Sequence, residues 1–332
     1  MTPLEFCGAL FLIMIGILGL LLSVVLYSLP KRISTKISGS HVLITGGSKG
    51  IGKSIAVEFI KQGASNVTIC ARSRPDLEKA QSDLQSYCKE VQKVNIYELD
   101  ITGGFEKILE TVRQIESEVG FVDVLVNNAG FVIQGEFGSL PAESVLKQME
   151  INYIGAAHLA RAVLPSMKER GHGHINFVSS AAGQCAIWGY GAYSPSKFAV
   201  RALADVLAAE CRPYNIGVSV LYPPNTETEG FQVEKREMPE QIKQISGSAG
   251  LFSSQEVANK CVTTIKNGAF NASVGFEGWL LCTLAAGASP ECSPLQAIAQ
   301  TLFAGIFRGI MLIYQGSFND IIQKLHKKTN KD

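Results

Sequence analysis

The chain has 332 residues, enough for one large α/β domain with additional segments, and its formal net charge is +1. A charge so close to zero gives no electrostatic support for nucleic-acid binding. Only 18% of the residues are charged and the mean hydropathy is positive, which indicates contact with a membrane. The eight cysteines show no metal-ligand spacing, so we expect reduced cytosolic thiols and no metal site.

The N-terminal segment is long and apolar enough to cross a membrane. Its 24 residues from Phe6 to Leu29 include no charge, and roughly 20 suffice to span the hydrocarbon core as a helix. The alternative is a cleaved signal peptide, but its apolar region would be shorter and preceded by basic residues, whereas Glu5 precedes this one. We therefore predict a membrane anchor over residues 1–30. Lys31 and Arg32 follow it, and the positive-inside rule then places the rest of the chain in the cytosol.

A buried strand predicted over 41–45 leads into a glycine-rich turn and a helix that begins near Ile51. This context is the one that a dinucleotide-binding fingerprint requires. The glycines let the backbone approach a pyrophosphate, and the helix N-terminus offers free N–H groups. We therefore predict cofactor binding by the residues of this turn, which are Gly46, Ser48, Lys49, Gly50, Ile51 and Gly52.

The second strand, predicted over 66–72, ends on Arg72, and no acidic residue lies close by. An NAD-binding unit commonly carries an acid at this point to hold the ribose 2′-hydroxyl, whereas an arginine can meet a 2′-phosphate. We therefore expect NADPH, with Arg72 and Lys49 near the phosphate. The alternative is that Arg72 only ends a strand.

The third and fourth strands, predicted over 94–99 and 122–126, both end in polar residues. Asp100 follows the third strand, where it could reach an adenine amino group or cap the next helix. Further cofactor-binding candidates at these two strand ends are Ile101 and Asn128.

A long helical region predicted over 141–162 contains Asn152 among apolar neighbours. A buried side-chain amide needs hydrogen-bond partners. Asn152 is therefore either a satisfied core amide or a group that holds water beside a site.

The start of the helix predicted over 193–211 carries Tyr193 and Lys197 four residues apart, on one helix face. Positive charge nearby favours the phenolate, so we expect a lowered Tyr193 pKa and acid–base work near neutral pH. The spacing alone is weak and also fits a surface pair. Ser180, at the end of a fifth strand predicted over 174–180, and the glycine turn upstream make the catalytic interpretation stronger.

Strands and helices alternate up to a sixth strand at 216–222. This alternation predicts a Rossmann-type, doubly wound parallel α/β sheet over residues 38–270. Such sheets bind ligands at the carboxyl ends of their strands, where the glycine turn and Ser180 should meet. The region 271–332 is unusually apolar. It fits a second membrane attachment, an apolar substrate entrance or ordinary core, and we favour a membrane-contacting region around the substrate entrance.

Taken together, the motifs resemble the short-chain dehydrogenase/reductase family. The matching pieces are Thr45-Gly46-x-x-x-Gly50-x-Gly52, Asn127-Asn128-Ala129-Gly130, Asn152, Ser180, Tyr193 and Lys197. The resemblance implies a seven-stranded sheet and a homo-oligomer paired through helices around 135–165 and 193–210.

The resemblance also implies a role for each matching side chain. Ser180 would orient the carbonyl and Tyr193 would donate the proton. Lys197 would bind the nicotinamide ribose and lower the tyrosine pKa, and Asn152 would hold a relay water. Thr228 would bind the carboxamide of the cofactor. One departure is the pair Pro223-Pro224, where the family usually has Pro-Gly; the resemblance therefore does not fix the conformation of this loop.

Within this family the anchor, the segment 222–231 and the segment 312–318 resemble the reductases of long-chain ketosphingoid bases. That resemblance implies a long-chain ketosphingoid substrate and NADPH. It also implies location at the endoplasmic reticulum membrane, with the catalytic domain facing the cytosol. One alternative is a membrane-anchored relative acting on steroid, retinoid or very-long-chain 3-ketoacyl substrates. Another is a non-catalytic NADPH-binding module.

Overall fold

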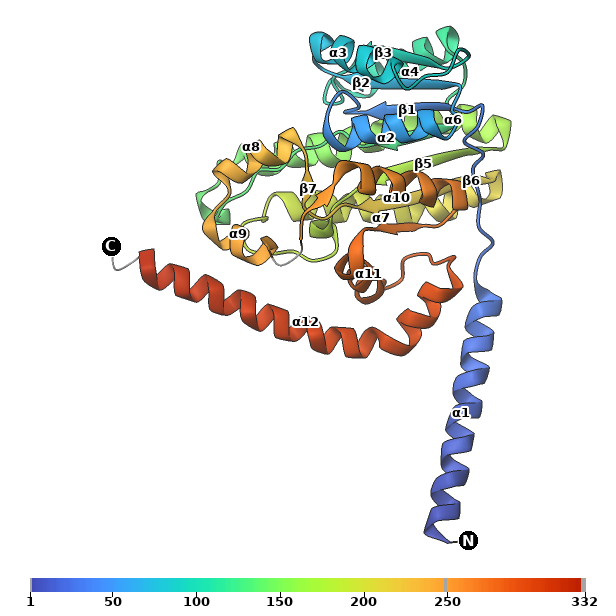
Figure 1. Cartoon of the computed structure of the whole chain (residues 1–332), viewed down its shortest axis with the longest axis vertical. Helices are drawn as coiled ribbons and strands as arrows, with labels where there is room; N and C mark the ends of the chain where they lie inside the picture. The colour runs from blue at the N-terminus through green and yellow to red at the C-terminus, as the bar shows by residue number, and fades with distance from the viewer. Residues whose placement is uncertain (1, 248–249, 330–332) are drawn as a thin grey trace.

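A parallel seven-stranded sheet forms the centre of the computed structural model, which describes residues 2–247 and 250–329 (Figure 1). The strand order is β3-β2-β1-β4-β5-β6-β9, so the doubly wound Rossmann prediction is confirmed. The strands are β1 (His41–Thr45), β2 (Asn66–Ala71), β3 (Lys93–Glu98), β4 (Val124–Asn127), β5 (Gly173–Val178), β6 (Ile216–Tyr222) and β9 (Asn271–Ser273). Residue 1 and residues 330–332, the ends of the predicted anchor and C-terminal region, lie outside the described residues.

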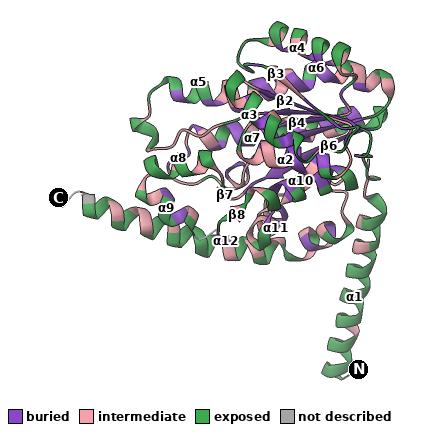
Figure 2. Ribbon diagram, turned by 45° about the horizontal axis from the view of Figure 1, so that its top comes forward, coloured by how far each residue is buried: buried purple, intermediate pink, exposed green. Residues whose placement is uncertain are grey.

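Helices cover both faces of the sheet, because the strands are apolar on both sides. In β1, Leu43 packs with α4, α6 and α7 on one face, while Val42 and Ile44 pack with α2, α3 and α10 on the other. Figure 2 shows this buried layer in purple. These helices are α2 (Gly50–Lys61), α3 (Arg74–Gln85), α4 (Phe105–Glu118), α6 (Gly155–Arg170), α7 (Tyr193–Cys211) and α10 (Ser254–Asn267).

Two elements differ from the sequence predictions. The helical region expected over 141–162 is α5 (Glu143–Met149) followed by a π-helical turn (Glu150–Ile154) and then α6. The seventh strand, β9, was expected only from the family resemblance. It has three residues, too few for periodicity to reveal, and it lies directly after residue 270.

Shorter elements complete the domain around the carboxyl ends of the strands. A second, two-stranded sheet pairs β7 with β8. The elements are β7 (Thr226–Glu227), β8 (Phe252–Ser253), α8 (Glu229–Glu237), α9 (Glu240–Ser246) and 3₁₀ turns at Phe137–Ser139, Ala181–Gly183 and Arg212–Tyr214.

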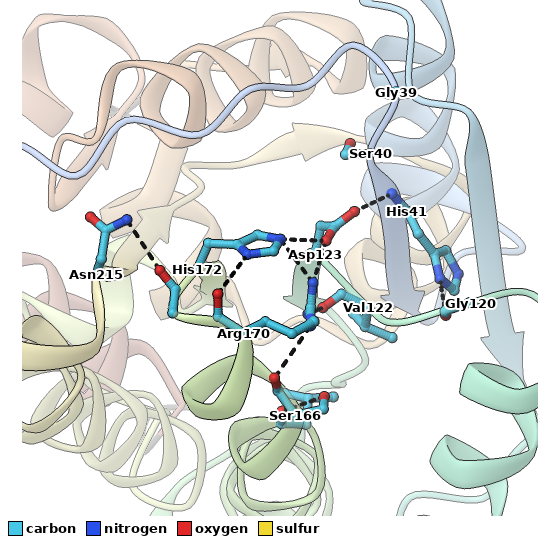
Figure 3. Close-up of polar contacts among 12 residues, drawn as sticks. Gly39, Ser40, His41, Gly120, Val122, Asp123, Ser166, Arg170, His172 and Asn215 are labelled. Atoms are coloured by element: carbon cyan, nitrogen blue, oxygen red, sulfur yellow. Dashed lines mark hydrogen bonds and ion pairs between the residues drawn. The ribbon is translucent and has the colours of Figure 1, made fainter.

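The amino edge of the sheet is held together by a polar network centred on Asp123, just before β4 (Figure 3). Its carboxylate accepts a hydrogen bond from the backbone N–H of His41 at 2.9 Å and from Nη1 of Arg170 at 2.7 Å. Nε2 of His172 lies 3.1 Å from the same carboxylate. One side chain thereby joins β1, β4, the end of α6 and the start of β5.

The N-terminal and C-terminal helices run in different directions relative to the domain. Figure 1 shows α1 (Pro3–Ser28) extending away from the domain, while α12 (Pro294–Thr329) runs beneath it, transverse to α1, next to α11 (Gly275–Leu284). None of the α1 residues is buried. By length and composition, α1 and most of α12 could each cross a membrane.

Candidate active site

A continuous cavity of about 1240 Å³ opens along the carboxyl edge of the sheet. Its walls come from the turn between β1 and α2, the ends of β2 to β6, helix α8 and the apolar helices α11 and α12. The glycine turn and the strand ends therefore meet at the edge where a doubly wound sheet is expected to bind its ligand.

Backbone geometry shapes the glycine turn at one end of the cavity. Gly46 and Gly50 have positive φ angles of 63° and 53°, a region that favours glycine. A Cβ on Gly52 would lie 2.3 Å from the carbonyl oxygen of Gly46, so Gly52 allows close packing. The Asn128 side chain donates hydrogen bonds to the carbonyls of Thr45 and Gly46, at 2.9 and 3.1 Å. The turn therefore exposes a bare, fixed backbone, which fits a pyrophosphate.

Most of the predicted cofactor-binding residues line this cavity, and Gly52 does not. Ser48, Lys49, Ile51, Arg72, Asp100 and Ile101 all do. Lys49 forms an ion pair with Asp76 at 2.7 Å, an acid at the start of α3 that sequence reasoning missed. Exposed Arg72 has no such partner among the described residues and is free to meet an anion.

Asp100 closes the turn that follows β3. Its Oδ1 accepts hydrogen bonds from the backbone N–H and the hydroxyl of Thr102, at 2.9 and 2.8 Å. Those bonds, and to a smaller extent the positive charges of Arg72 and Lys107, lower the Asp100 pKa. The N-cap of α4 is Gly104, so Asp100 does not cap that helix. Its carboxylate is an anionic acceptor in the cavity wall.

The structure brings Tyr193, Lys197 and Ser180 together deeper in the same cavity. Tyr193 is the first residue of α7, Lys197 lies one turn later, and Ser180 is the second residue after β5, where it caps a 3₁₀ turn. Lys197 Nζ lies 5.8 Å from the centre of the Tyr193 ring and donates a hydrogen bond to the carbonyl of Val178 at 3.0 Å. Burial lowers the Lys197 pKa to about 8, so the amine is mostly charged at neutral pH.

The expected lowering of the Tyr193 pKa is wrong for this structure. Burial raises the pKa of Tyr193 to about 12, against the opposing effect of the Ser180 hydroxyl and with a smaller raising effect from the Glu234 charge. Lys197 lies over the ring, 5.8 Å from its centre, and the removal of the phenol from water is the largest effect on its pKa. Tyr193 is therefore a protonated phenol at neutral pH.

Asn152 lies in the π-helical turn and does not line the cavity. Its side chain accepts from the Phe131 N–H and donates to the Phe131 carbonyl, both at 3.0 Å, and to Ser196 Oγ at 3.0 Å. A Cβ on Gly130 would lie 2.9 Å from Asn152 Oδ1 and 3.2 Å from Lys197 Nζ. The amide is thus a satisfied core group that lies next to the Lys197 amine.

The Pro223-Pro224 loop keeps Thr228 at the cavity despite the missing glycine. The carbonyl of Pro223 accepts a hydrogen bond from Ala181 N at 3.0 Å, which ties the loop to the end of β5. Thr228 caps α8, its hydroxyl accepting from Phe231 N at 3.0 Å. Its methyl carbon would lie 3.3 Å from a Cβ on Gly50, so the threonine adjoins the glycine turn.

Sequence reasoning expected the region 271–332 around the substrate entrance but named none of the residues that form the far wall of the cavity. Apolar residues of the C-terminal helices form this wall, namely Phe276, Leu280, Leu281, Ile310, Met311, Tyr314 and Phe318. Glu234 on α8, also missed, faces the cavity near Tyr193. Only the apolar composition of residues 271–332 hinted at the wall, and a glutamate in a polar helix gives no signal of its own.

The overall architecture matches that of solved Rossmann-fold proteins. Levodione reductase shares 24% identity and a TM-score of 0.63 over 69% of this chain and 91% of its own. A short-chain dehydrogenase from Burkholderia phymatum, solved in complex with NAD, shares 22% identity and a TM-score of 0.63 over 72% of this chain and 89% of its own. Fold and site together define a Rossmann-fold protein with a dinucleotide-type cavity at the carboxyl edge of its sheet.

The sequence comparisons narrow this class. The pattern of the family described as short chain dehydrogenase matches residues 40–239, and the chain belongs to that family. Relatives include 3-dehydrosphinganine reductase of Danio rerio and 3-ketodihydrosphingosine reductase of Mus musculus. Each is 40% identical over 90% of this chain and 91% of its own length. The 3-ketodihydrosphingosine reductase of Dictyostelium discoideum is 36% identical over 91% of this chain and 93% of its own.

Proposed function

We propose that this chain reduces 3-ketosphinganine to sphinganine, with NADPH as the hydride donor. The observation that carries the proposal is the continuity of one cavity. The polar set Ser180, Tyr193 and Lys197 lines its interior, and the apolar wall of α11 and α12 continues from there. A substrate with a polar ketone end and a long alkyl chain fits this division, since each buried methylene contributes about 0.8 kcal/mol. The names of relatives that match nearly the whole chain support the same substrate.

The chain's own residues supply the proton and the orientation. Bound NADPH would deliver a hydride to the carbonyl carbon. Tyr193 then protonates the alkoxide oxygen, which is a stronger base than a phenolate, so a phenol with a pKa of about 12 can donate. Ser180 holds the same oxygen by a hydrogen bond and stabilises its developing charge. Lys197 provides positive charge beside the phenol, and Asn152 positions the Phe131 backbone and the start of α7.

We also propose NADPH in preference to NADH, and Arg72 supports this choice. Its exposed guanidinium stands at the cavity, with no ion-pair partner among the described residues, and can bind a 2′-phosphate. Lys49 is less available, because Asp76 already pairs with it. The glycine turn would hold the pyrophosphate and Thr228 the carboxamide end.

Location at the endoplasmic reticulum membrane, with the domain in the cytosol, completes the proposal. The segment after α1 is tied to the domain: Arg32 Nε donates to the Cys292 carbonyl at 3.1 Å, just before α12. If α1 spans the bilayer, α12 lies along its surface, because the two helices are transverse (Figure 1). Met311 then faces the cavity while Ile313, 75% exposed, faces lipid. Substrate would enter the cavity from the membrane along this helix.

A homo-oligomer is part of the same proposal. Leu146 on α5 and Val206 on α7 are 59% and 53% exposed, and these two helices lie where the family pairs its subunits. Apolar residues of this kind on neighbouring helices favour burial against a second copy. Chemical crosslinking of the detergent-solubilised chain tests the idea, and a monomer at all concentrations would contradict it.

The decisive experiment follows NADPH oxidation by the detergent-purified full chain. We expect turnover of 3-ketosphinganine and far slower turnover of steroid, retinoid and long-chain 3-ketoacyl substrates. A preference for one of those ketones would keep the reductase chemistry and overturn the substrate. NADPH binding without turnover of any ketone would favour the non-catalytic alternative.

A further inference from the structure

An acidic side chain that the proposed chemistry does not use lies near the reacting groups. Glu234, on α8, lines the cavity together with Tyr193 and Ser180. Its charge contributes to raising the pKa of both Tyr190 and Tyr193, which places the carboxylate within electrostatic reach of the phenol. Tyr190 and Tyr193 pack edge to face with ring centres 5.3 Å apart. The carboxylate therefore faces the part of the cavity that holds the ketone end of a substrate.

The Glu234 carboxylate has no hydrogen bond or ion pair among the described residues. Its backbone is nevertheless fixed, because the carbonyl of Glu234 accepts a hydrogen bond from Gln134 Nε2 at 2.9 Å. Burial raises the pKa of this carboxyl to about 7. A carboxylate in such surroundings is costly unless a cation pairs with it. Lys197, the buried amine that lines the same cavity, is hydrogen-bonded to Val178 instead.

Other acids that line the cavity are less suited to receive a cation next to the ketone. Asp76 is paired with Lys49 and Asp100 is held by Thr102. Glu237, one turn further along α8, is exposed. Glu277 belongs to α11, in the apolar wall. Among the described cavity acids, Glu234 therefore combines partial burial, nearness to Tyr193 and a free carboxylate.

The substrate of the proposed function carries the complementary group. In 3-ketosphinganine the carbon next to the carbonyl bears an amino group, which is an ammonium when protonated. If Tyr193 and Ser180 hold the ketone oxygen, the ammonium must lie in the same part of the cavity, one carbon away from the reacting centre. We infer that Glu234 binds this ammonium and so selects 2-amino ketones over neutral long-chain ketones.

This inference rests on the proposed function and adds a specificity-determining contact to it. The ammonium is present in both the bound substrate and the transition state. Its contact with Glu234 therefore stabilises the bound substrate and the transition state alike, so the contact acts mainly on KM. Binding the cation also removes the penalty of an unpaired carboxylate, so recognition of the ammonium and relief of that penalty occur together.

The test compares two substrates in three proteins. The substrates are 3-ketosphinganine and 1-hydroxyoctadecan-3-one, which lacks only the amino group. The proteins are the full chain, Glu234→Gln and Glu237→Gln, the last as a matched control on the same helix. For Glu234→Gln we expect kcat/KM for 3-ketosphinganine to fall about 10- to 100-fold, mainly through KM, since hydrogen bonds to charged groups are the stronger class. The neutral ketone has no ammonium for Glu234 to bind. For this substrate we expect kcat/KM to change by less than about threefold.

The ratio between the two substrates separates recognition from simple damage to the fold. Glu237→Gln should leave that ratio unchanged, and Glu234→Asp should restore part of the preference for the amine. Equal losses on both substrates in Glu234→Gln would overturn the inference while leaving the proposed function intact. So would a loss of preference in Glu237→Gln alone. If the unmodified chain reduced the neutral ketone but not 3-ketosphinganine, both the proposed function and the inference would be wrong.

Discussion

The two edges of the central sheet handle polar groups in opposite ways. At the amino edge, the Asp123 carboxylate receives bonds from the His41 backbone and from Arg170 (Figure 3). At the carboxyl edge, the side chain of Asn127 and the hydroxyl of Tyr222 are buried without a partner in the described protein. A saturated network stabilises the fold, whereas unpaired buried groups cost stability, and those of the carboxyl edge lie beneath the cavity without lining it. The comparison predicts that substitutions at the two edges will have different consequences.

The sharpest test of the carboxyl edge is Tyr193→Phe. Loss of the proton donor should lower kcat for 3-ketosphinganine by about 10²- to 10⁴-fold, the usual contribution of a general acid. The free energy of unfolding should stay nearly unchanged, because the variant removes a hydroxyl without leaving a cavity. Tyr190→Phe, whose ring packs against Tyr193, is the control and should keep most of the activity. Retention of full activity in Tyr193→Phe would remove the central catalytic assignment.

The corresponding test of the amino edge is Asp123→Ala. Removing this carboxylate leaves Arg170, whose side chain is 17% exposed, without its ion-pair partner, and leaves the His41 N–H unbonded. We expect a loss of about 2–3 kcal/mol in the free energy of unfolding, measured by denaturant titration in detergent. The kcat per folded molecule should not change. Asp83→Ala, which breaks the exposed pair with Lys53, should have a much smaller effect, because water screens exposed pairs; equal effects would remove the distinction between the edges.

A third test uses pH and the histidines of the amino half of the sheet. His174 in β5 is buried and bonded to Ser219 at 2.8 Å, and burial lowers its pKa to about 3; the His41 pKa is lowered as well, chiefly by burial. In the unfolded chain each of these two histidines binds a proton as the pH falls through about 6.5, whereas in the folded chain it stays neutral at that pH. Stability is therefore complete above pH 6.5 and falls as pH drops below it, by up to about 1.4 kcal/mol per unit for each such histidine.

Denaturant titrations between pH 7.5 and pH 5 measure this slope. His174→Gln should flatten it, whatever its effect on stability at pH 7.5, because glutamine does not titrate. His172→Gln, at an exposed ring, should leave most of the slope in place. An unchanged slope in His174→Gln would contradict the assignment of the acid sensitivity to this buried ring.

The sequence predicted the parts of the fold that have strong local periodicity or a fixed spacing. This group comprises the N-terminal apolar helix, six of the strands, the glycine turn and the placing of Tyr193 and Lys197 on one helix face. The seventh strand and the break in the helix around Asn152 do not, because three residues of strand and a π-helical turn are decided by tertiary packing.

The residues of the site that were missed share a different cause. Glu234 and Met311 reach the cavity from α8 and α12, far along the chain from the catalytic motifs. No spacing rule links segments that meet only through the tertiary fold. The Tyr193 pKa was predicted in the wrong direction for a related reason: sequence shows the neighbouring charge of Lys197 but not the degree of burial, and burial dominates.

The smallest expected effect concerns the cofactor end of the carboxyl edge. Arg72→Ala should weaken NADPH binding about tenfold, because a charge-assisted contact to the 2′-phosphate contributes about 1.5–3 kcal/mol and Lys49 can replace part of it. Binding of NADH, which has no such phosphate, should change little. Arg74→Ala is the matched control, since Arg74 pairs with Glu78 on the surface and is absent from the cavity wall. Equal weakening of both cofactors in Arg72→Ala would mean that the arginine supports the strand end and not the phosphate. The preference for NADPH would then need another source at this edge, and Lys49, released from Asp76, would be the next residue to replace.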